Sequence, residues 1–385
     1  MTSATHPVRA TSSQSPDLRI AEIPSSVLVI VTRRSGDVLL TAPLIRSIKN
    51  AWPSTHIDLL VFKGTEDVLA GNPDIRRIIA VPQSGSIARH WRLARHLWRK
   101  YDLAISTSPG DRPTLYAWLA GIARIGVMTD GFKSMWKRAL LSAIVPFDNL
   151  DSHTVVQNLR LADLLGLPRR FETPIEWSAQ DEATITGVFP GFGRTKFAVL
   201  HLYPKFTYKM WHLDQWQALA RWLNARGLTV VLTGSGDKEE KNYVSRFADT
   251  ASPSPVNLAG QLDFSQLALL LSCASLYVGP DTVTTHLAAA MGAPTVALFG
   301  PSNPVKWGPW PRGYEASSRE VQASPYTLRG TQFAGNVALV QGAGACVPCL
   351  QEGCARHVMS ESVCLQMLPA AAVIEAAEKI LNQGN

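Results

Sequence analysis

The sequence lacks long hydrophobic runs and is poor in charge. Of its 385 residues only 17% are charged and 46% are hydrophobic, and no uninterrupted apolar stretch reaches the roughly 20 residues that span a membrane. Residues 1–26 are polar and contain no apolar core of a signal peptide. These absences argue against an integral membrane protein. They predict a globular, cytoplasmic protein whose residues 1–25 form a flexible tail.

Several common catalytic motifs are also missing. The chain has no G-x-x-x-x-G-K-[ST] phosphate loop, no G-x-G-x-x-G after a first strand and no G-x-S-x-G nucleophile elbow. It has no D-x-D pair to hold a metal-bound diphosphate. The absence of these motifs argues against a kinase, a nicotinamide dehydrogenase and a serine hydrolase.

Cysteine is scarce, with five in the chain, which does not fit a secreted disulfide scaffold of this length. Four of them form C-x2-C-x4-C-x9-C, at Cys346, Cys349, Cys354 and Cys364. The first pair has the spacing of a metal knuckle, but the second half does not repeat it. Zinc, iron and free thiols are the alternatives, with free thiols favoured. Cys273 lies in an apolar run and is expected in the core.

The chain is basic, with a formal charge of +7 and a pI near 9.2. Nucleic acid, membrane phospholipid and a phosphorylated substrate all have the charge to bind it. No nucleic-acid-binding motif is recognisable, so we expect no nucleic-acid partner. Residues 89–100, RHWRLARHLWRK, predict a basic amphipathic helix that either packs its Trp and Leu side chains on the core or contacts a membrane.

Apolar runs alternate with helical patterns, which predicts parallel sheets covered by helices. In the first half the expected strands are residues 27–32, 57–62, 77–81, 103–106 and 115–121. In the second half they are residues 197–202, 229–232, 276–278 and 295–299, with helices near residues 214–225, 238–248 and 264–273. Since 385 residues exceed one typical core, we predict an α/β fold of two Rossmann-like, doubly wound domains that face a cleft.

The join between the domains is predicted near residues 167–178, LPRRFETPIEWS, where the periodicity is lost. We therefore assign residues 26–172 to the first domain and residues 173–368 to the second. Residues 369–385 predict a last helix that returns to brace the first domain.

Residues 276–310 combine a strand, a polar turn, a short Ala-rich helix and a second strand. The unpaired N–H groups and the positive dipole end at the start of such a helix favour a phosphate or diphosphate. Asp281 and Thr282 lie at this start, where Asp281 alone would fit an ordinary helix cap. His286 follows one turn later on the same face, and the polar pair favours a nucleotide site.

Ligands of open α/β sheets bind beyond the carboxyl ends of the strands, so the loops there should face the cleft. Asp37 follows the first strand and is a candidate general base, although a lone carboxylate there fits a helix cap better. Candidates for binding an acceptor are Arg33, Arg34, Gly36, Asp111 and Arg112.

Two loops of the second half are candidates for holding a nucleotide donor. Lys205 and Lys209 follow its first strand, and either could neutralise a departing diphosphate. After the next strand, GSGDKEE places Asp237, Glu239 and Glu240, one of which could accept hydrogen bonds from ribose hydroxyls.

Seven motifs occur in order, namely SGDVLLTAPLIRSIKNAWP, LAGNPDI, GIARIGV, HTVVQNLRLADLLGLP, KMWHLDQWQALARWL, NLAGQLDFSQLALLLSCA and GPDTVTTHLAAAMGAPTVALFGPSNPVKWGP. Together they resemble the ADP-heptose:lipopolysaccharide heptosyltransferases, glycosyltransferase family nine. The resemblance implies a GT-B fold with a nucleotide-sugar donor, ADP-heptose, on the second domain. It implies inverting transfer without metal or cofactor to the phosphorylated inner core of lipopolysaccharide. This acceptor is an anionic glycolipid, so peripheral contact with the cytoplasmic face of the inner membrane is also implied.

The family's pattern assigns roles to single residues. Asp37 would be the base, and Lys209 would contact the donor phosphates. The donor pocket would be lined by Asp281, Thr282, Val283, Thr284 and His286. Family members often have Gly where Val283 stands, so the backbone is expected to approach the phosphates less freely.

Other functions stay open beside this one. One branch of the family carries a cysteine finger for iron and modifies proteins, so a protein acceptor or another nucleotide sugar is an alternative. A non-catalytic protein that binds nucleotide sugars or lipids is an alternative of another class, against which the presence of Asp37 argues.

Overall fold

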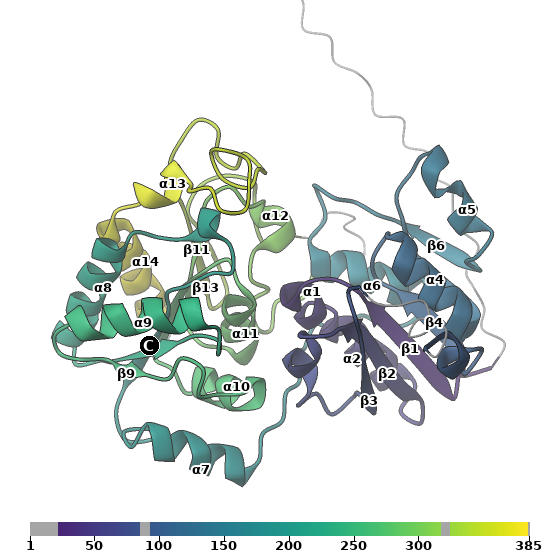
Figure 1. Ribbon diagram of the computed structural model, residues 1–385, viewed down its shortest axis with the longest axis horizontal. Helices are drawn as coiled ribbons and strands as arrows, with labels where there is room; N and C mark the ends of the chain where they lie inside the picture. The colour runs from purple at the N-terminus through teal and green to yellow at the C-terminus, as the bar shows by residue number, and fades with distance from the viewer. Residues whose placement is uncertain (1–21, 85–92, 317–323, 384–385) are drawn as a thin grey trace, which may run out of the picture.

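The computed structural model describes residues 22–84, 93–316 and 324–383, which form two α/β domains side by side (Figure 1). The predicted tail lies outside the described residues up to residue 21. Its last residues belong to the first domain, because Thr55 donates a hydrogen bond to the Pro24 carbonyl and Ser25 donates one to Asp102. Within the described residues no helix is long and apolar enough to cross a membrane.

The first domain is built on six parallel strands in the order β3-β2-β1-β4-β5-β6. Side chains alternate between the two faces of the central strand β1. Val27, Val29 and Val31 join one apolar cluster, and Leu28 and Ile30 join another. The strands are β1 (Ser26–Val31), β2 (His56–Phe62), β3 (Arg77–Val81), β4 (Tyr101–Ser106), β5 (Gly121–Met128) and β6 (Ala143–Pro146).

Helices cover both faces of this sheet, as continuous apolar strands require. On one face α2 and α6 pack together, and on the other α4 packs on β1 and β4. The helical segments are α1 (Ser35–Leu39), α2 (Ala42–Ala51), η1 (Glu66–Leu69), α4 (Asp111–Ala120), η2 (Phe132–Ser134), α5 (Met135–Arg138) and α6 (Thr154–Leu164).

One predicted strand of this domain, residues 115–121, is wrong. Those residues form the end of α4, and the strand β5 begins only at Gly121. The burial has a helical period, since Tyr116, Ala117 and Ala120 are buried while Leu115 is 42% exposed. The other predicted strands of both halves, and the three predicted helices of the second, are confirmed to within two residues at each end.

The second domain has seven strands in the order β12-β13-β11-β10-β7-β8-β9, parallel except for the edge strand β12. The strands are β7 (Phe197–His201), β8 (Thr229–Thr233), β9 (Val256–Asn257), β10 (Leu276–Pro280), β11 (Thr295–Phe299), β12 (Gln332–Ala334) and β13 (Val337–Gln341). The helical segments are α7 (Ala179–Val188), η3 (Thr207–Lys209), α8 (Leu213–Ala225), α9 (Lys238–Thr250), α10 (Phe264–Ser272), α11 (Val283–Met291), α12 (Pro304–Trp307), α13 (Val363–Gln366) and α14 (Ala370–Gln383).

The last helix, α14, does not return to the first domain as predicted. It packs against α8, β11 and β13 of the second domain. Val373, Ala377 and Ile380 are buried in the same apolar cluster as the core of this sheet, and Arg226 pairs with Glu378. The apolar face of α14 therefore completes the second core.

The chain passes from the first sheet to the second through α6, an extended segment at residues 168–178, and α7. This segment follows the first domain, where Arg170 N donates to Ser47 and Glu176 N donates to the Gly71 carbonyl. The helix α7 then packs on α10 of the second domain. The predicted boundary at residues 172 and 173 falls within this extended segment and stays a prediction.

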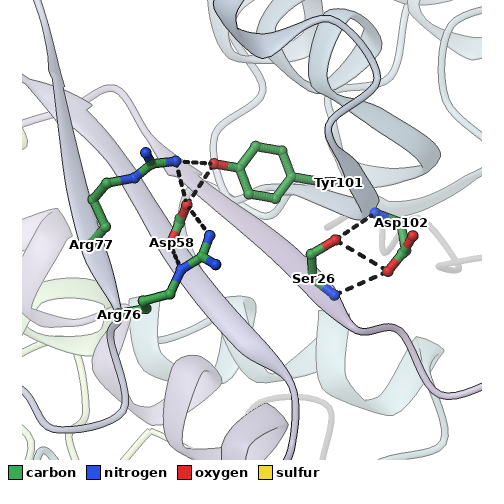
Figure 2. A network of polar contacts seen from close by, with 6 residues as sticks. All are labelled: Ser26, Asp58, Arg76, Arg77, Tyr101 and Asp102. Atoms are coloured by element: carbon green, nitrogen blue, oxygen red, sulfur yellow. Dashed lines mark hydrogen bonds and ion pairs between the residues drawn. The ribbon is translucent and has the colours of Figure 1, made fainter.

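A polar network ties the first sheet together at the end of the strands away from the carboxyl edge (Figure 2). The buried Asp58 carboxylate accepts hydrogen bonds from Arg76, Arg77 and Tyr101 at 2.6 to 2.9 Å. Burial acts to raise the pKa of Asp58, but these hydrogen bonds hold it below the ordinary value. Asp102 and Ser26 link β4 to β1 in the same way. The network is structural and leaves the opposite edge free for ligands.

Candidate active site

The two domains meet at the starts of α1 and α11, which follow β1 and β10. A Cβ atom placed on Gly36 of α1 would lie 3.7 Å from Cδ2 of His286 on α11. The loop after the first strand of one domain therefore lies directly against the predicted nucleotide helix of the other, at the carboxyl edges of both sheets.

Asp281, just before α11, is held by a lysine from another strand end. Lys209 Nζ donates to Asp281 Oδ2 at 2.5 Å and to the Asp281 carbonyl at 3.1 Å. Burial acts to raise the pKa of Asp281, yet the charges of Lys209 and His286 hold it below its usual value. Asp281 is not the helix cap, because Thr282 occupies that position without a side-chain cap bond. Lys205 is exposed, so the structure distinguishes the two candidate lysines.

His286 is buried beside Asp281, with Nε2 3.7 Å from Oδ1. Burial lowers the pKa of His286 to about 4, against the attraction of Asp281, and the charge of Lys209 lowers it further. Its Nδ1 has no hydrogen-bond partner among the described residues. Near neutral pH the side chain is therefore an uncharged imidazole whose buried Nδ1 has no partner among the described residues.

The start of α11 is fixed by hydroxyl groups beneath it. Thr285 Oγ1 donates to the Pro280 carbonyl at 2.5 Å and lies 2.9 Å from the buried Tyr277 hydroxyl. Thr282 Oγ1 lies 3.3 Å from the same Thr285 oxygen, and Thr284 is buried. Val283 is half-buried and packs on the apolar cluster that continues into the first domain. Its side chain thus has a place in the interdomain core.

The acids after β8 have different tasks. Asp237 caps α9, accepting from the backbone N–H groups of Glu239 and Glu240 at 2.9 and 3.3 Å. Glu240 is buried and accepts a hydrogen bond from Ser235, whereas Glu239 is exposed. Asp237 is thus occupied by the helix, and Glu240 is the acid held at the strand end.

Asp37 lies on α1 with 15% of its side chain exposed, and its Oδ1 accepts a hydrogen bond from Arg33 Nε at 3.2 Å. Burial raises the pKa of Asp37 above the ordinary 3.8, against the charge and hydrogen bond of Arg33. Arg34 instead reaches the second domain, with its guanidinium carbon 4.3 Å from the centre of the Phe206 ring. A buried carboxylate of raised pKa suits a general base.

A small cleft opens beside Asp37 between the domains. Its polar lining comes mainly from the first domain and includes Lys306 of the second. The lining residues are Arg33, Asp37, Thr41, Thr107, Ser108, Pro109, Phe147, Thr154, Gln157, Asn158, Lys306 and Trp307.

Of the five acceptor candidates, Arg33 alone lines this cleft. Asp111 is exposed and pairs with Lys137 at 2.8 Å, and Arg112 donates to the Gln83 carbonyl at 2.6 Å. Both lie at the start of α4, just beyond cleft residues Ser108 and Pro109. The sequence reasoning missed Lys306 and the hydroxyl and amide residues of the cleft. Lys306 lies in the motif GPDTVTTHLAAAMGAPTVALFGPSNPVKWGP, and this was the signal that could have identified it.

The cysteines are free thiols. Burial raises the pKa of Cys364 to about 11, and Cys349, Cys354 and Cys346 act on it in the same direction. Among the described residues no group of three or more His, Cys, Asp or Glu side chains is arranged to hold a metal ion. Cys273 is exposed at the end of α10, so its predicted place in the core is wrong.

The basic segment at residues 89–100 is only partly described, because residues 85–92 lie outside the described residues. Residues 93–97 are helical and Leu97 is buried, so this part packs on the core. Trp98 is 52% exposed, and its ring lies 5.9 Å from that of Trp118.

Two Rossmann-like domains that face each other across a cleft, with a buried carboxylate on one side and the start of a helix on the other, have the arrangement of the GT-B fold. A model of the family described as glycosyltransferase family 9 (heptosyltransferase) matches residues 90–335, more than half of the chain. The chain belongs to this family and is a glycosyltransferase.

Relatives and solved structures agree with this assignment. Lipopolysaccharide heptosyltransferase 3 of Escherichia coli is 28% identical over 295 residues, covering 72% of this chain and 84% of the relative. A family 9 glycosyltransferase from Veillonella parvula has a similar structure, with a TM-score of 0.74, 19% identity and coverage of 96% and 99% of the two chains. The ADP-heptose lipopolysaccharide heptosyltransferase II of Escherichia coli matches with a TM-score of 0.71, 20% identity and coverage of 93% and 99%.

Proposed function

We propose that this glycosyltransferase transfers heptose from ADP-heptose to the phosphorylated inner core of lipopolysaccharide, with inversion and without a metal. The observation that carries the proposal is the contact between α1 and α11, which places Gly36, the neighbour of Asp37, against His286 and so near the Lys209–Asp281 pair. The names of the similar proteins supply the sugar and the acceptor class.

In the proposed reaction Asp37 takes the proton of an acceptor hydroxyl. The hydroxyl oxygen attacks the anomeric carbon of heptose while the bond from that carbon to the diphosphate oxygen breaks. ADP leaves with the bonding electron pair. The raised pKa of Asp37 makes it a better base than an exposed carboxylate. Its 3.2 Å hydrogen bond to Arg33 fixes the carboxylate orientation.

The donor diphosphate would bind where Lys209 and the first N–H groups of α11 converge. Neutral His286 would line the donor pocket with its ring, and Thr282, Val283 and Thr284 would border the donor with their backbone. Glu240 would take the ribose hydroxyls in preference to Asp237, whose carboxylate caps α9.

On the acceptor side, Arg33 lines the cleft beside Asp37, Gly36 lies against His286, and Arg34 would act through its contact with Phe206. Asp111 and Arg112 would reach only an acceptor that extends past Pro109.

We further propose that the enzyme works at the cytoplasmic face of the inner membrane as a peripheral protein. Exposed Trp98 with the neighbouring Arg95, Arg99 and Lys100 offers an aromatic and basic contact for anionic lipid. Co-sedimentation with vesicles of phosphatidylglycerol tests this contact. Replacing Trp98 and Arg99 with Ser should weaken the binding, and unchanged binding would contradict it.

The function itself is tested by incubating the protein with a panel of nucleotide sugars and truncated lipopolysaccharide acceptors, with release of nucleoside diphosphate as the readout. We expect release only with ADP-heptose and a core acceptor. Release with a different sugar or a protein acceptor would replace the proposed substrates. No release with any pair, despite nucleotide binding, would indicate a non-catalytic binding protein.

A further inference from the structure

Lys306 belongs to α12 of the second domain but ends among residues of the first. Its Nζ donates to the Asp148 carbonyl at 3.2 Å and to Asn149 Oδ1 at 3.1 Å. It lies 4.6 Å from the centre of the Phe147 ring. The residue is 5% exposed, so a lysine of one domain is buried against the other.

A buried ammonium group normally has a carboxylate partner, because its desolvation is unfavourable. Among the described residues no carboxylate oxygen lies within ion-pair distance of Lys306. Burial lowers the pKa of Lys306 to about 8, and the charge of Arg33 lowers it too, while Asp148 and Asp37 act to raise it. Its hydrogen-bond partners are a neutral carbonyl and a neutral amide.

The surroundings of Lys306 favour an anion. It lines the cleft together with Arg33 and Asp37, so two cations face one carboxylate there. Ser108 also lines the cleft, whereas the donors of Thr107 and Asn158 are already bonded to the Ile30 and Leu40 carbonyls. Lysine and arginine form strong charge-assisted hydrogen bonds with phosphate, so the two cations are the groups that would hold it.

We propose that Lys306 and Arg33 bind a phosphate group of the acceptor next to Asp37, in a site that is complete only when the second domain brings Lys306 into the cleft. The proposal rests on the proposed function and adds the group that the acceptor must carry near its reacting hydroxyl. It makes Lys306 a determinant of acceptor specificity that belongs to the donor domain.

A purely structural role for Lys306 makes a different prediction. The same junction already has uncharged hydrogen bonds, since Asn303 Nδ2 donates to the Leu150 carbonyl at 2.7 Å. His153 Nε2 lies 2.7 Å from the Gly308 carbonyl. These contacts hold the domains together without a charge, so Asn303 provides a matched control. Asn303→Ser keeps an oxygen for the helix cap but shortens the reach to Leu150.

The test compares Lys306→Met, Lys306→Arg and Asn303→Ser with the unaltered protein. Transfer of heptose is measured to a phosphorylated core acceptor and to the same acceptor after phosphatase treatment. We expect Lys306→Met to raise the acceptor KM about 10- to 100-fold on the phosphorylated acceptor only, the range of a lost charge-assisted hydrogen bond. The donor KM should change less than about twofold, and Lys306→Arg should recover most of the affinity.

Equal losses by Lys306→Met on both acceptors would overturn the phosphate site, and so would a phosphate-dependent loss of the same size in Asn303→Ser. Should Lys306→Met fold poorly, Arg33→Gln provides a second variant. It should raise the acceptor KM on the phosphorylated acceptor only, together with a loss of kcat on both acceptors because Arg33 also orients Asp37. The unaltered protein decides the proposed function separately, because absence of transfer to either acceptor contradicts that function. In that case, calorimetric binding of the two acceptors in the presence of ADP still tests the site.

Discussion

The ion pair between Lys209 and Asp281 allows a quantitative test of the contacts that form the proposed donor site. Lys209→Met keeps most of the side-chain length and removes the charge. The lysine is 17% exposed and the aspartate 8%, so the change leaves a buried carboxylate without its strongest partner. Removing one member of a buried ion pair destabilises a protein by about 3–5 kcal/mol.

The expected value lies at the low end of this range, about 3 kcal/mol, because His286 offers partial compensation. Its Nε2 is 3.7 Å from Asp281, and the charge of Lys209 is one of the causes that lower its pKa. Without Lys209 the pKa of His286 rises, and a protonated imidazole can replace the ammonium group at mildly acidic pH. The loss of stability should therefore be larger at pH 8 than at pH 5.5.

The pH dependence expected from the pKa of Asp281 has the same direction. The pKa of Asp281 is lowered in the folded protein, so the stabilisation by the pair is present above the ordinary carboxyl pKa and is lost as the pH falls through the folded value.

Urea unfolding at pH 8 without nucleotide measures the change in the free energy of unfolding. Asp281→Asn and the variant with both substitutions complete a double-mutant cycle. Lys205→Met is the control, because this exposed lysine of the same loop should change the free energy of unfolding by less than about 0.5 kcal/mol. The midpoint of thermal unfolding should fall by about 6–12 °C in Lys209→Met. Single losses that add within about 0.5 kcal/mol in the double variant would refute the pairing.

Four further outcomes follow from the geometry. Asp37→Asn should lower kcat by about 10²- to 10⁴-fold with the ADP dissociation constant nearly unchanged, and ordinary turnover in this variant would remove Asp37 as the base. The raised pKa of Asp37 should place the acidic limb of the kcat/KM profile above pH 3.8, whereas a profile flat down to that pH would contradict it. Since the pKa of Lys306 is about 8 and the lysine is charged below it, KM for a phosphorylated acceptor should rise above pH 8 but stay level in Lys306→Arg. Gly342→Ala would place a Cβ 2.2 Å from the Cys364 carbonyl and should destabilise by about 1–3 kcal/mol in denaturant unfolding, whereas Gly236→Ala, with open space, should be nearly neutral.

The strands could be predicted from the sequence because a buried parallel strand is a continuous aliphatic run between turn residues. Residues 295–299 coincide with β11 for this reason. The same rule gave a wrong strand at residues 115–121. This apolar run is too short to show a helical period by itself, and the helix to which it belongs begins at Asp111. The position of α14 was also predicted wrongly, because the sequence of an amphipathic helix does not show which of two sheets its apolar face will cover.

For the site, local patterns identified groups at strand ends, and the topology brought them together. Asp37 follows β1, Lys209 follows β7, and Asp281 and His286 both follow β10, yet all four lie where the carboxyl edges of the two sheets meet. Lys306 could not be predicted in this way, because nothing in its neighbourhood along the chain shows that its side chain crosses to the other domain.

The packing of α14 on the second sheet has a consequence for how such enzymes can be recombined. In the described part of the chain the polypeptide passes between the sheets once, within residues 168–178, and the last helix adds no second covalent connection. In the described part of the chain the first and second domains are thus encoded by two uninterrupted stretches. One fusion point in this segment would suffice to join the first domain to the second domain of a relative. The relative's second domain would, however, place its own residue, at the position of Lys306, in the cleft beside Asp37.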